Sequence, residues 1–300
     1  MKHTKTYIAL IISMIFWGFS FVWSKVALET YLPITIIFFR LIVSSIAIFI
    51  FAKISKINLK IQKKHIKLFV LLAFFEPFLY FLGETFGLQK VSATTTAVLI
   101  STIPIFVPIF VFFIFKEKLS KINFIGSIIS FIGILIIVLN NNFSLDASLS
   151  GILLIALAVF AAVGYSLAVK KIAEIYNPVL IVLYQNTIAI LLFLPLFLQF
   201  DLKAFMNTSQ NINSLLAIIE LGIFASSIAF ILFAYGIKKI GVSKAGFFTN
   251  LIPIFTSIIA FFILDEKLSF IKYLGIFIVV SGLFLSQSPS LKTRKLNAKK

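Results

Sequence analysis

A few charged side chains inside otherwise apolar segments are the residues of this sequence best suited to chemistry. Glu76, Tyr80 and Glu84 are spaced four residues apart, so they share one face of a helix over residues 66–86. Arg40 lies about a third of the way into an earlier apolar segment, at a depth between the two glutamates. Because a charge in hydrocarbon costs at least ~2.5–3.5 kcal/mol, we interpret these residues as a candidate site for a substrate or an ion.

Two interpretations of these charges remain open. In the first, Glu76 binds and releases a proton that couples to the movement of a cargo, or it balances the charge of a cationic cargo. In the second, a glutamate and Arg40 form a static pair that joins two helices. We favour the first interpretation for Glu76 and the second for Arg40.

Two aromatic residues and four prolines are further candidates. Trp17 and Tyr165 lie near the middle of apolar segments, away from the membrane interface where Trp and Tyr are usually found. Each is expected either to line a cavity or to pack between helices. A proline frees the backbone carbonyl about one turn before it and bends the helix. The candidate bends are Pro77, Pro104, Pro108 and Pro253.

The composition indicates that helices crossing a lipid bilayer position these residues. The 300 residues are 61% hydrophobic and 12% charged, with a mean hydropathy of +1.12, whereas a soluble domain is about half apolar and a quarter charged. The apolar blocks are continuous, which favours helices over a membrane barrel. We predict an all-α membrane protein with ten transmembrane helices. The predicted spans are 7–27, 33–52, 66–86, 94–115, 122–140, 149–170, 178–200, 213–237, 243–264 and 270–286.

The basic residues indicate how these helices are oriented. If the spans alternate in direction, 21 of the 27 Lys and Arg residues fall on the side of the N-terminus and five on the other, and Arg40 lies within a span. Short loops rich in Lys and Arg remain in the cytoplasm, so both termini are predicted to be cytoplasmic. The net charge of +17 is therefore a sign of membrane topology, and we expect no nucleic-acid partner.

An internal repeat relates the two halves of the sequence. A shift of 149 residues places Pro104 on Pro253 and Glu117 on Glu266, each within a longer identical segment. The same shift makes Ser101 and Asn250 equivalent. We expect these two to approach a central cavity from opposite halves, or to bond backbone groups and neighbouring helices. Glu117 and Glu266 are expected to cap the loops that follow their helices.

The repeat divides the chain into two halves of five predicted helices each. The first half covers residues 1–141, the second covers 149–287, and 288–300 is a basic cytoplasmic tail. Because five is odd, the second half must be inverted relative to the first. Inverted repeats are typical of secondary transporters, in which the substrate site lies between the repeats near the middle of the membrane.

The paired motifs resemble those of the EamA-type branch of the drug/metabolite transporter superfamily. The resemblance implies a bacterial inner-membrane carrier, in most cases an exporter of amino acids or other small metabolites, with a central cavity between the halves. The motifs that carry it are Trp17-Gly18-Phe19-Ser20, Phe39-Arg40, Gly87-Leu88-Gln89-Lys90-Val91-Ser92, Glu117-Lys118-Leu119-Ser120, Gly126 with Gly133, Asp265-Glu266-Lys267-Leu268, and Gly275 with Gly282.

Other classes of function fit the sequence less well. There is no cysteine, no phosphate-binding Gly-Lys loop and no metal-ligand motif, and both histidines, His3 and His65, fall at the ends of spans. We therefore expect neither an enzyme nor a cofactor. The expected partners are a small-molecule substrate and the lipid bilayer, and the sequence is compatible with a monomer. A flippase for lipids or amphipathic drugs, or a channel-like protein, is the alternative.

Overall fold

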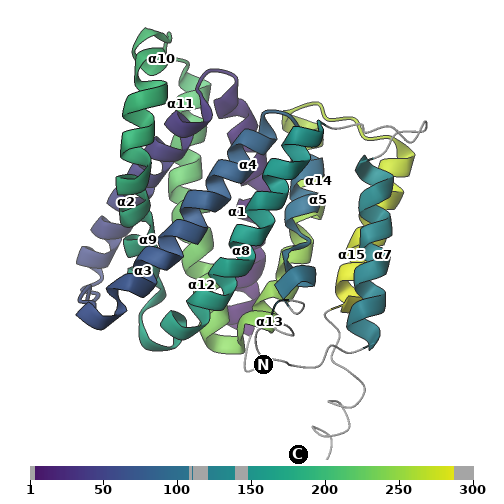
Figure 1. Ribbon diagram of the computed structural model, residues 1–300, viewed down its shortest axis with the longest axis horizontal. Coiled ribbons are helices and arrows are strands. Elements are labelled where there is room, and N and C mark those ends of the chain that lie inside the picture. Colours follow the sequence, from purple (N-terminus) through teal and green to yellow (C-terminus); the bar gives the residue numbers. More distant parts are fainter. Residues whose placement is uncertain (1–3, 108–109, 111–120, 139–147, 287–300) are drawn as a thin grey trace, which may run out of the picture.

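Helices account for nearly all of the described structure. The computed structural model describes residues 4–107, 110, 121–138 and 148–286, which form one bundle (Figure 1). In the first half the helices are α1 (Thr4–Leu28), α2 (Pro33–Ile54), η1 (Lys63–His65), α3 (Ile66–Ala73), η2 (Phe74–Leu79), α4 (Tyr80–Leu88), α5 (Ala93–Ile100) and α7 (Lys121–Val138). In the second half they are α8 (Leu149–Ile175), α9 (Pro178–Leu196), η3 (Phe197–Asp201), α10 (Leu202–Asn207), α11 (Ile212–Glu220), η4 (Leu221–Ala229), α12 (Phe230–Ile240), α13 (Val242–Gly246), η5 (Phe247–Leu251), α14 (Ile252–Ile263) and α15 (Phe270–Ser286).

These helices identify an all-α membrane protein, as predicted. Seven stretches among the described residues are long and apolar enough to cross a membrane, and three shorter apolar helices cover 93–107, 124–137 and 270–285. The count of ten spans therefore stays a prediction. The start of α1 and the end of α15 lie at the same end of the bundle (Figure 1), which we call the terminus end. Pro108 and Glu117 lie outside the described residues.

Several helices begin at residues whose chemistry favours a helix start. α2 and α9 begin with a proline, whose fixed φ suits the first turn and whose missing N–H has no partner there in any case. The side chain of Asn177 accepts a hydrogen bond from the backbone N–H of Val179 at 2.9 Å. Ser92 caps α5 in the same way through the N–H of Thr95.

Helices are interrupted at matching places in the two halves. Between α3 and α4 the π-helical segment η2 leaves helical geometry at Glu76, with φ −146° and ψ 118°, just before Pro77. The 149-residue shift places Glu76 on Ala225, which lies within the π-helical segment η4. α5 likewise ends at Ile100. The 149-residue shift places Ile100 on Thr249, which lies in the 3-10 segment η5. The expected bends at Pro77, Pro104 and Pro253 are thus helix breaks that lie within a few residues of each proline.

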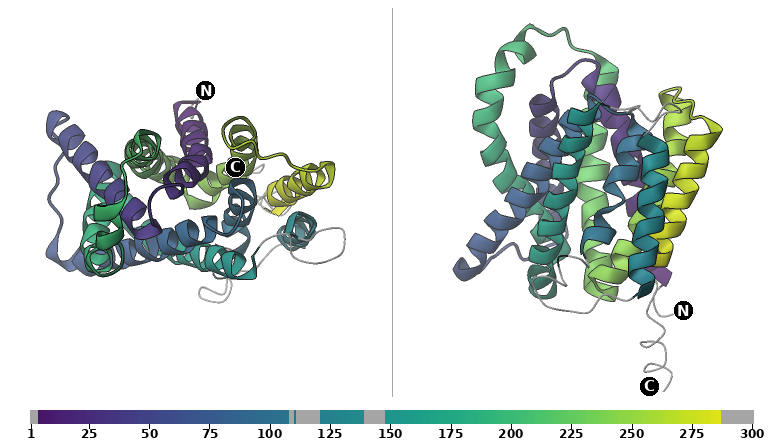
Figure 2. Two further views of the ribbon diagram at one scale, coloured as in Figure 1. Left: turned by 90° about the horizontal axis from the view of Figure 1, so that it is seen from above. Right: turned by 45° about the vertical axis from the view of Figure 1, so that its right-hand side comes forward.

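The packing of the helices follows the same correspondence. α4 lies along α8, and α12 lies along α1; α5 contacts α8, and α14 contacts α1. α2 packs on α9 at the side of the bundle away from α7 and α15 (Figure 1). α7 and α15 form a pair at one edge, visible in both views of Figure 2.

The α7–α15 pair is held close by glycines. A Cβ atom on Gly133 would lie 2.7 Å from the backbone N of Val279, and one on Gly275 would lie 3.2 Å from the carbonyl oxygen of Gly133. Gly282 meets Gly126 at the other crossing point. Because the residue numbers rise along one helix as they fall along the other, the two helices run antiparallel. Each glycine therefore contacts the repeat equivalent of the other one: Gly133 meets Gly275, the equivalent of Gly126, and Gly126 meets Gly282, the equivalent of Gly133.

Candidate functional site

A cavity of about 230 Å³ lies inside the bundle, and most of the residues singled out from the sequence border it. Its wall combines α1, α2, the broken helix 63–88, residues 100–107, α8, α12 and residues 246–252. The charged and large aromatic candidates in the wall are Trp17, Arg40, Glu76, Tyr80, Glu84 and Tyr165. The structure thus brings together residues from four segments that are up to 148 positions apart in the sequence.

Arg40 and Glu84 face each other between α2 and α4. Arg40 Nη1 lies 3.9 Å from Glu84 Oε2, and the side chains are only 2% and 4% exposed. Tyr80 donates a long hydrogen bond of 3.4 Å to the other carboxylate oxygen, Oε1. The four-residue spacing seen in the sequence therefore brings Tyr80 and Glu84 together on one turn of α4.

The remaining contacts of Arg40 join the two halves of the chain. Its Nε donates to Ser226 Oγ in η4 at 2.9 Å, and its Cζ lies 4.0 Å from the centre of the Phe81 ring. A guanidinium above an aromatic face gains cation–π attraction, which offsets part of the cost of burial. Arg40 accordingly connects α2, α4 and η4.

A chain of hydroxyl and amide groups continues from Arg40 toward α9. Ser44 Oγ and Ser227 Oγ are 2.7 Å apart, and Asn186 Nδ2 donates both to Ser44 Oγ at 2.8 Å and to the carbonyl oxygen of Ser226 at 3.1 Å. Sequence reasoning missed this network. The only signal was the presence of polar residues in apolar spans, which does not reveal which of them meet.

Glu76 differs from Glu84 because its carboxylate has no partner. No hydrogen bond or ion pair of its side chain is found among the described residues, although the side chain is only 8% exposed and borders the cavity. The helix break places it beside α8, where the Phe75 ring covers Gly164 next to Tyr165. The Tyr165 hydroxyl donates to Gln185 Oε1 at 3.3 Å.

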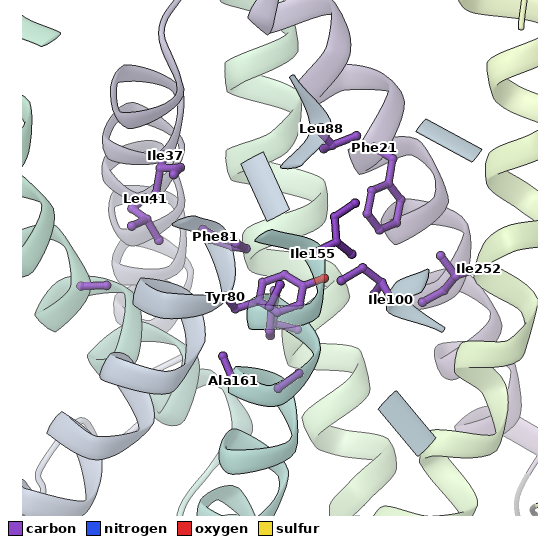
Figure 3. Packing of buried hydrophobic residues seen from close by; sticks show 14 of the residues in the cluster. Phe21, Ile37, Leu41, Tyr80, Phe81, Leu88, Ile100, Ile155, Ala161 and Ile252 are labelled. Atoms are coloured by element: carbon purple, nitrogen blue, oxygen red, sulfur yellow. The ribbon is translucent and has the colours of Figure 1, made fainter. Parts of the chain in front are cut away.

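Aromatic rings form much of the remaining wall. Trp17 packs against Phe230, with ring centres 5.1 Å apart, and against Phe233 at 4.9 Å. Figure 3 shows the Tyr80 ring among the buried side chains, with its hydroxyl directed toward Ile100. Trp17 and Tyr165 therefore both border the cavity and pack against neighbouring helices.

Ser101 and Asn250 do not border the cavity. Both are fully buried, and Ser101 donates to the carbonyl oxygen of Val98 at 2.7 Å, two residues inside the end of α5. Their neighbours Ile100 and Thr249, which are also repeat equivalents, take the positions in the wall. The expected approach of these two residues to the cavity is thus not observed, and the bond from Ser101 to a backbone carbonyl fits the alternative interpretation.

Among the described residues, the charged side chains of the cavity wall all come from the first half of the chain. Phe81 and Phe230 are repeat equivalents, and both line the cavity. The equivalent of Glu84, however, is Phe233. The two halves thus contribute similar shapes and different electrostatics.

Two carboxylates connect the halves at the end of the bundle opposite the terminus end. Glu266 Oε1 accepts the N–H of Ala93 at 2.8 Å, and Oε2 accepts the N–H and hydroxyl of Thr94. Asp201 Oδ2 similarly accepts the N–H of Thr35 at 2.8 Å, near the start of α2. Glu266, which follows the end of α14, therefore caps the start of α5 in the other half. A negative charge is favourable at a helix N-terminus.

A bundle of apolar helices around a buried cavity with charged side chains has the architecture of a membrane transporter. The chain belongs to the EamA-like transporter family, whose model matches residues 4–139 and 149–287. The resemblance inferred from the motifs is thereby confirmed. The family match covers these residue ranges and says nothing of Arg40, Glu76 and Glu84 in the cavity wall.

Similar proteins cover nearly the whole chain. The uncharacterized transporters YetK and YdfC of Bacillus subtilis (strain 168) are 26% and 29% identical, over 95% and 94% of this chain and 87% and 89% of their own. An uncharacterized transporter of Archaeoglobus fulgidus is 27% identical over 94% of this chain and 98% of its own. A crystal structure matches with a TM-score of 0.72 at 14% identity, covering 98% of this chain and 99% of that one, which shows a shared fold.

Proposed function

We propose that this protein is a secondary transporter that exports a small organic metabolite, such as an amino acid, across the bacterial cytoplasmic membrane. The observation that carries the proposal is the cavity itself, with the unpartnered carboxylate of Glu76 at a helix break in its wall. Broken helices near the middle of the membrane are typical of transporter binding sites, because the break exposes polar groups to the cargo.

Alternating access between two inverted halves is the proposed mechanism. The antiparallel α7–α15 pair and the matching breaks at Glu76 and in η4 support an inverted relationship between residues 1–141 and 149–287. Rocking of one half against the other would expose the cavity first at one end and then at the other.

The position of the cavity supports the proposed direction of transport. Its wall reaches Ile237 and Gly246, which lie near the terminus end, whereas Glu266 and Asp201 hold the halves together at the opposite end. The excess of Lys and Arg on this side supports a cytoplasmic position for the terminus end. The cavity would accordingly load from the cytoplasm and release outside.

Glu76 is the proposed site of proton coupling. The titratable and charged groups packed around it are Tyr80 and Glu84 on its own helix, Arg40 on α2 and Tyr165 on α8. Arg40 already pairs with Glu84, so Glu76 is the carboxyl group left to exchange a proton with the cavity.

Transport into proteoliposomes tests the proposal. Purified protein is reconstituted and offered a panel of labelled amino acids and metabolites, with and without an imposed pH gradient. At least one compound should show saturable transport. Ser166→Trp, which fills the cavity wall, should abolish it, whereas Phe277→Trp, at a side chain 69% exposed on the outside, should not. Transport that survives Ser166→Trp, or movement of labelled phospholipid alone, would contradict a central metabolite pathway.

A further inference from the structure

We propose that the cargo is a compact organic cation that carries no carboxylate. Its charge is balanced by Glu76, and it is enclosed by the rings of Trp17, Tyr80 and Tyr165. This inference rests on the transport function proposed above. Within the class of small organic metabolites, it replaces the amino acid given there as an example with a cation that has no carboxylate.

The first argument concerns the charges that a cargo can reach. Arg40 Nη1 and Glu84 Oε2 are both sealed from solvent and lie 3.9 Å apart, and no residue that the structure describes forms a hydrogen bond with either atom. Arg40 Nε is already bonded to Ser226. An amino-acid carboxylate that binds at Nη1 would therefore have to break the buried pair with Glu84. One that binds at Nε would have to break the bond to Ser226.

The second argument concerns Glu76. Among the charged residues of the cavity wall, it is the one with neither a hydrogen bond nor an ion pair in the described structure, and it keeps an exposed fraction of 8%. Burying a carboxylate without a hydrogen-bond or ion-pair partner costs free energy, because the carboxylate loses its hydration. A cation that enters the cavity would offset this cost. Glu76 thus offers the cavity an acidic group that a cargo can reach.

The third argument concerns the aromatic wall. Aromatic faces attract cations electrostatically and attract carboxylates poorly. The face of Phe81 is already covered by Arg40, with Cζ 4.0 Å from the ring centre, but Trp17, Tyr80 and Tyr165 border the open space. Phe230 and Phe233 support Trp17 from behind. Aromatic rings from several helices suit an ammonium group better than a zwitterion.

The size of the cavity limits the cation. Pockets for drug-sized ligands measure about 300–1,000 Å³, and this one measures about 230 Å³. The second half adds no further charge to the wall, because Phe233 stands where the first half has Glu84. A single compact monocation therefore fits better than a polycation.

Binding to the purified protein in detergent tests this inference with ligands matched in shape. Phenylethylamine, phenylalanine and 3-phenylpropionate share a phenyl group and differ in charge, while tetramethylammonium and benzyltrimethylammonium extend the cationic series. Binding is followed by tryptophan fluorescence and calorimetry. We expect at least one of the three cations to bind saturably, phenylethylamine to bind at least about tenfold more tightly than phenylalanine, and phenylpropionate not to bind.

Variants of Glu76 complete the test. Glu76→Gln should weaken binding of the cation at least about tenfold, Glu76→Asp should retain most of it, and Glu29→Gln, at an exposed carboxylate, should have no effect. An unchanged melting temperature shows that each variant is folded. If Glu76→Gln does not fold, the binding of phenylethylamine, phenylalanine and 3-phenylpropionate to Glu76→Asp is compared in its place.

Three results would overturn the inference: phenylalanine binding as tightly as phenylethylamine, no binding of any of the three cations, or wild-type binding by Glu76→Gln. The metabolite panel in proteoliposomes separates this failure from that of the proposed function. Saturable transport of zwitterions without cation binding would leave a transporter whose cargo is assigned wrongly. Cation binding that depends on Glu76, without transport of any compound, would support the cation site and contradict the proposed transport function.

Discussion

Arg40 Nη1 and Glu84 Oε2 lie 3.9 Å apart in the interior of the bundle, and neither atom has a hydrogen-bond partner among the described residues. The pair joins α2 to α4, while Arg40 Nε reaches across to Ser226 in the second half. Each charge thus depends on the other for compensation in a place that water does not reach.

Removal of Arg40 should therefore destabilise the protein strongly. Arg40→Met leaves Glu84 uncompensated and should lower the free energy of unfolding by ~3–5 kcal/mol, seen as a lower melting temperature in detergent. The double variant Arg40→Met/Glu84→Gln should recover part of the loss. Lys203→Met, at an exposed lysine, is the control. A melting temperature of Arg40→Met equal to that of the wild type would show that the pair contributes nothing.

Glu76→Gln should abolish the dependence of transport on pH. Glutamine matches glutamate in shape but cannot bind and release a proton at neutral pH, so the variant should insert into the membrane normally and lose its response to an imposed pH gradient. Efflux from preloaded proteoliposomes at several pH gradients measures this. Normal proton dependence in the variant would assign coupling to another group.

The glycine contacts between α7 and α15 should tolerate no side chain. In Gly133→Ala the new Cβ would lie 2.7 Å from the backbone N of Val279, so the helices must separate, at a cost of about 1–3 kcal/mol. Gly246→Ala is the matched control, because no described atom lies within 4 Å of its Cβ position. Equal melting temperatures for the two variants would contradict the close packing.

Loss of the Glu266 cap should open the end of the bundle opposite the termini. The chain has no cysteine, so Ser166→Cys in the cavity wall can report access to a membrane-impermeant thiol reagent added outside. Glu266→Gln weakens the bonds to Ala93 and Thr94 by ~1 kcal/mol, which corresponds to roughly fivefold faster labelling. Asp265→Asn, at the exposed neighbour, should leave the rate unchanged. Faster labelling in both variants would point to a general loosening.

Single cysteines should also decide the orientation. With both termini in the cytoplasm, Ser209→Cys between α10 and α11 should react with the impermeant reagent in intact cells, and Ser55→Cys after α2 should react only after permeabilisation. Both positions are exposed, so access depends on the side of the membrane. The reverse pattern would place the termini outside and invert the proposed direction of transport.

Part of the site could be predicted from the sequence because the bilayer makes charge rare. Arg40, Glu76 and Glu84 stand out in apolar spans, and all three border the cavity. The four-residue spacing likewise predicted correctly that Tyr80 and Glu84 lie on one helix face, where they form a hydrogen bond. Ser44, Asn186 and Ser226 could not be assigned, because serine and asparagine occur in membrane helices for many reasons and their partners are far away in sequence.

The sequence by itself determined the solvent, the secondary structure and the family, because hydrophobic length, the distribution of Lys and Arg, and repeated motifs are properties of local segments. Only the tertiary structure decided which glutamate is paired. Glu76 and Glu84 are two turns apart on one face by sequence, yet Glu84 meets Arg40, while Glu76 has no ion-pair or hydrogen-bond partner in the part of the chain that the structure describes. The reason is physical: the helix breaks at Glu76, and the pairing depends on contacts of α2 with α4 and η4 that no local pattern encodes.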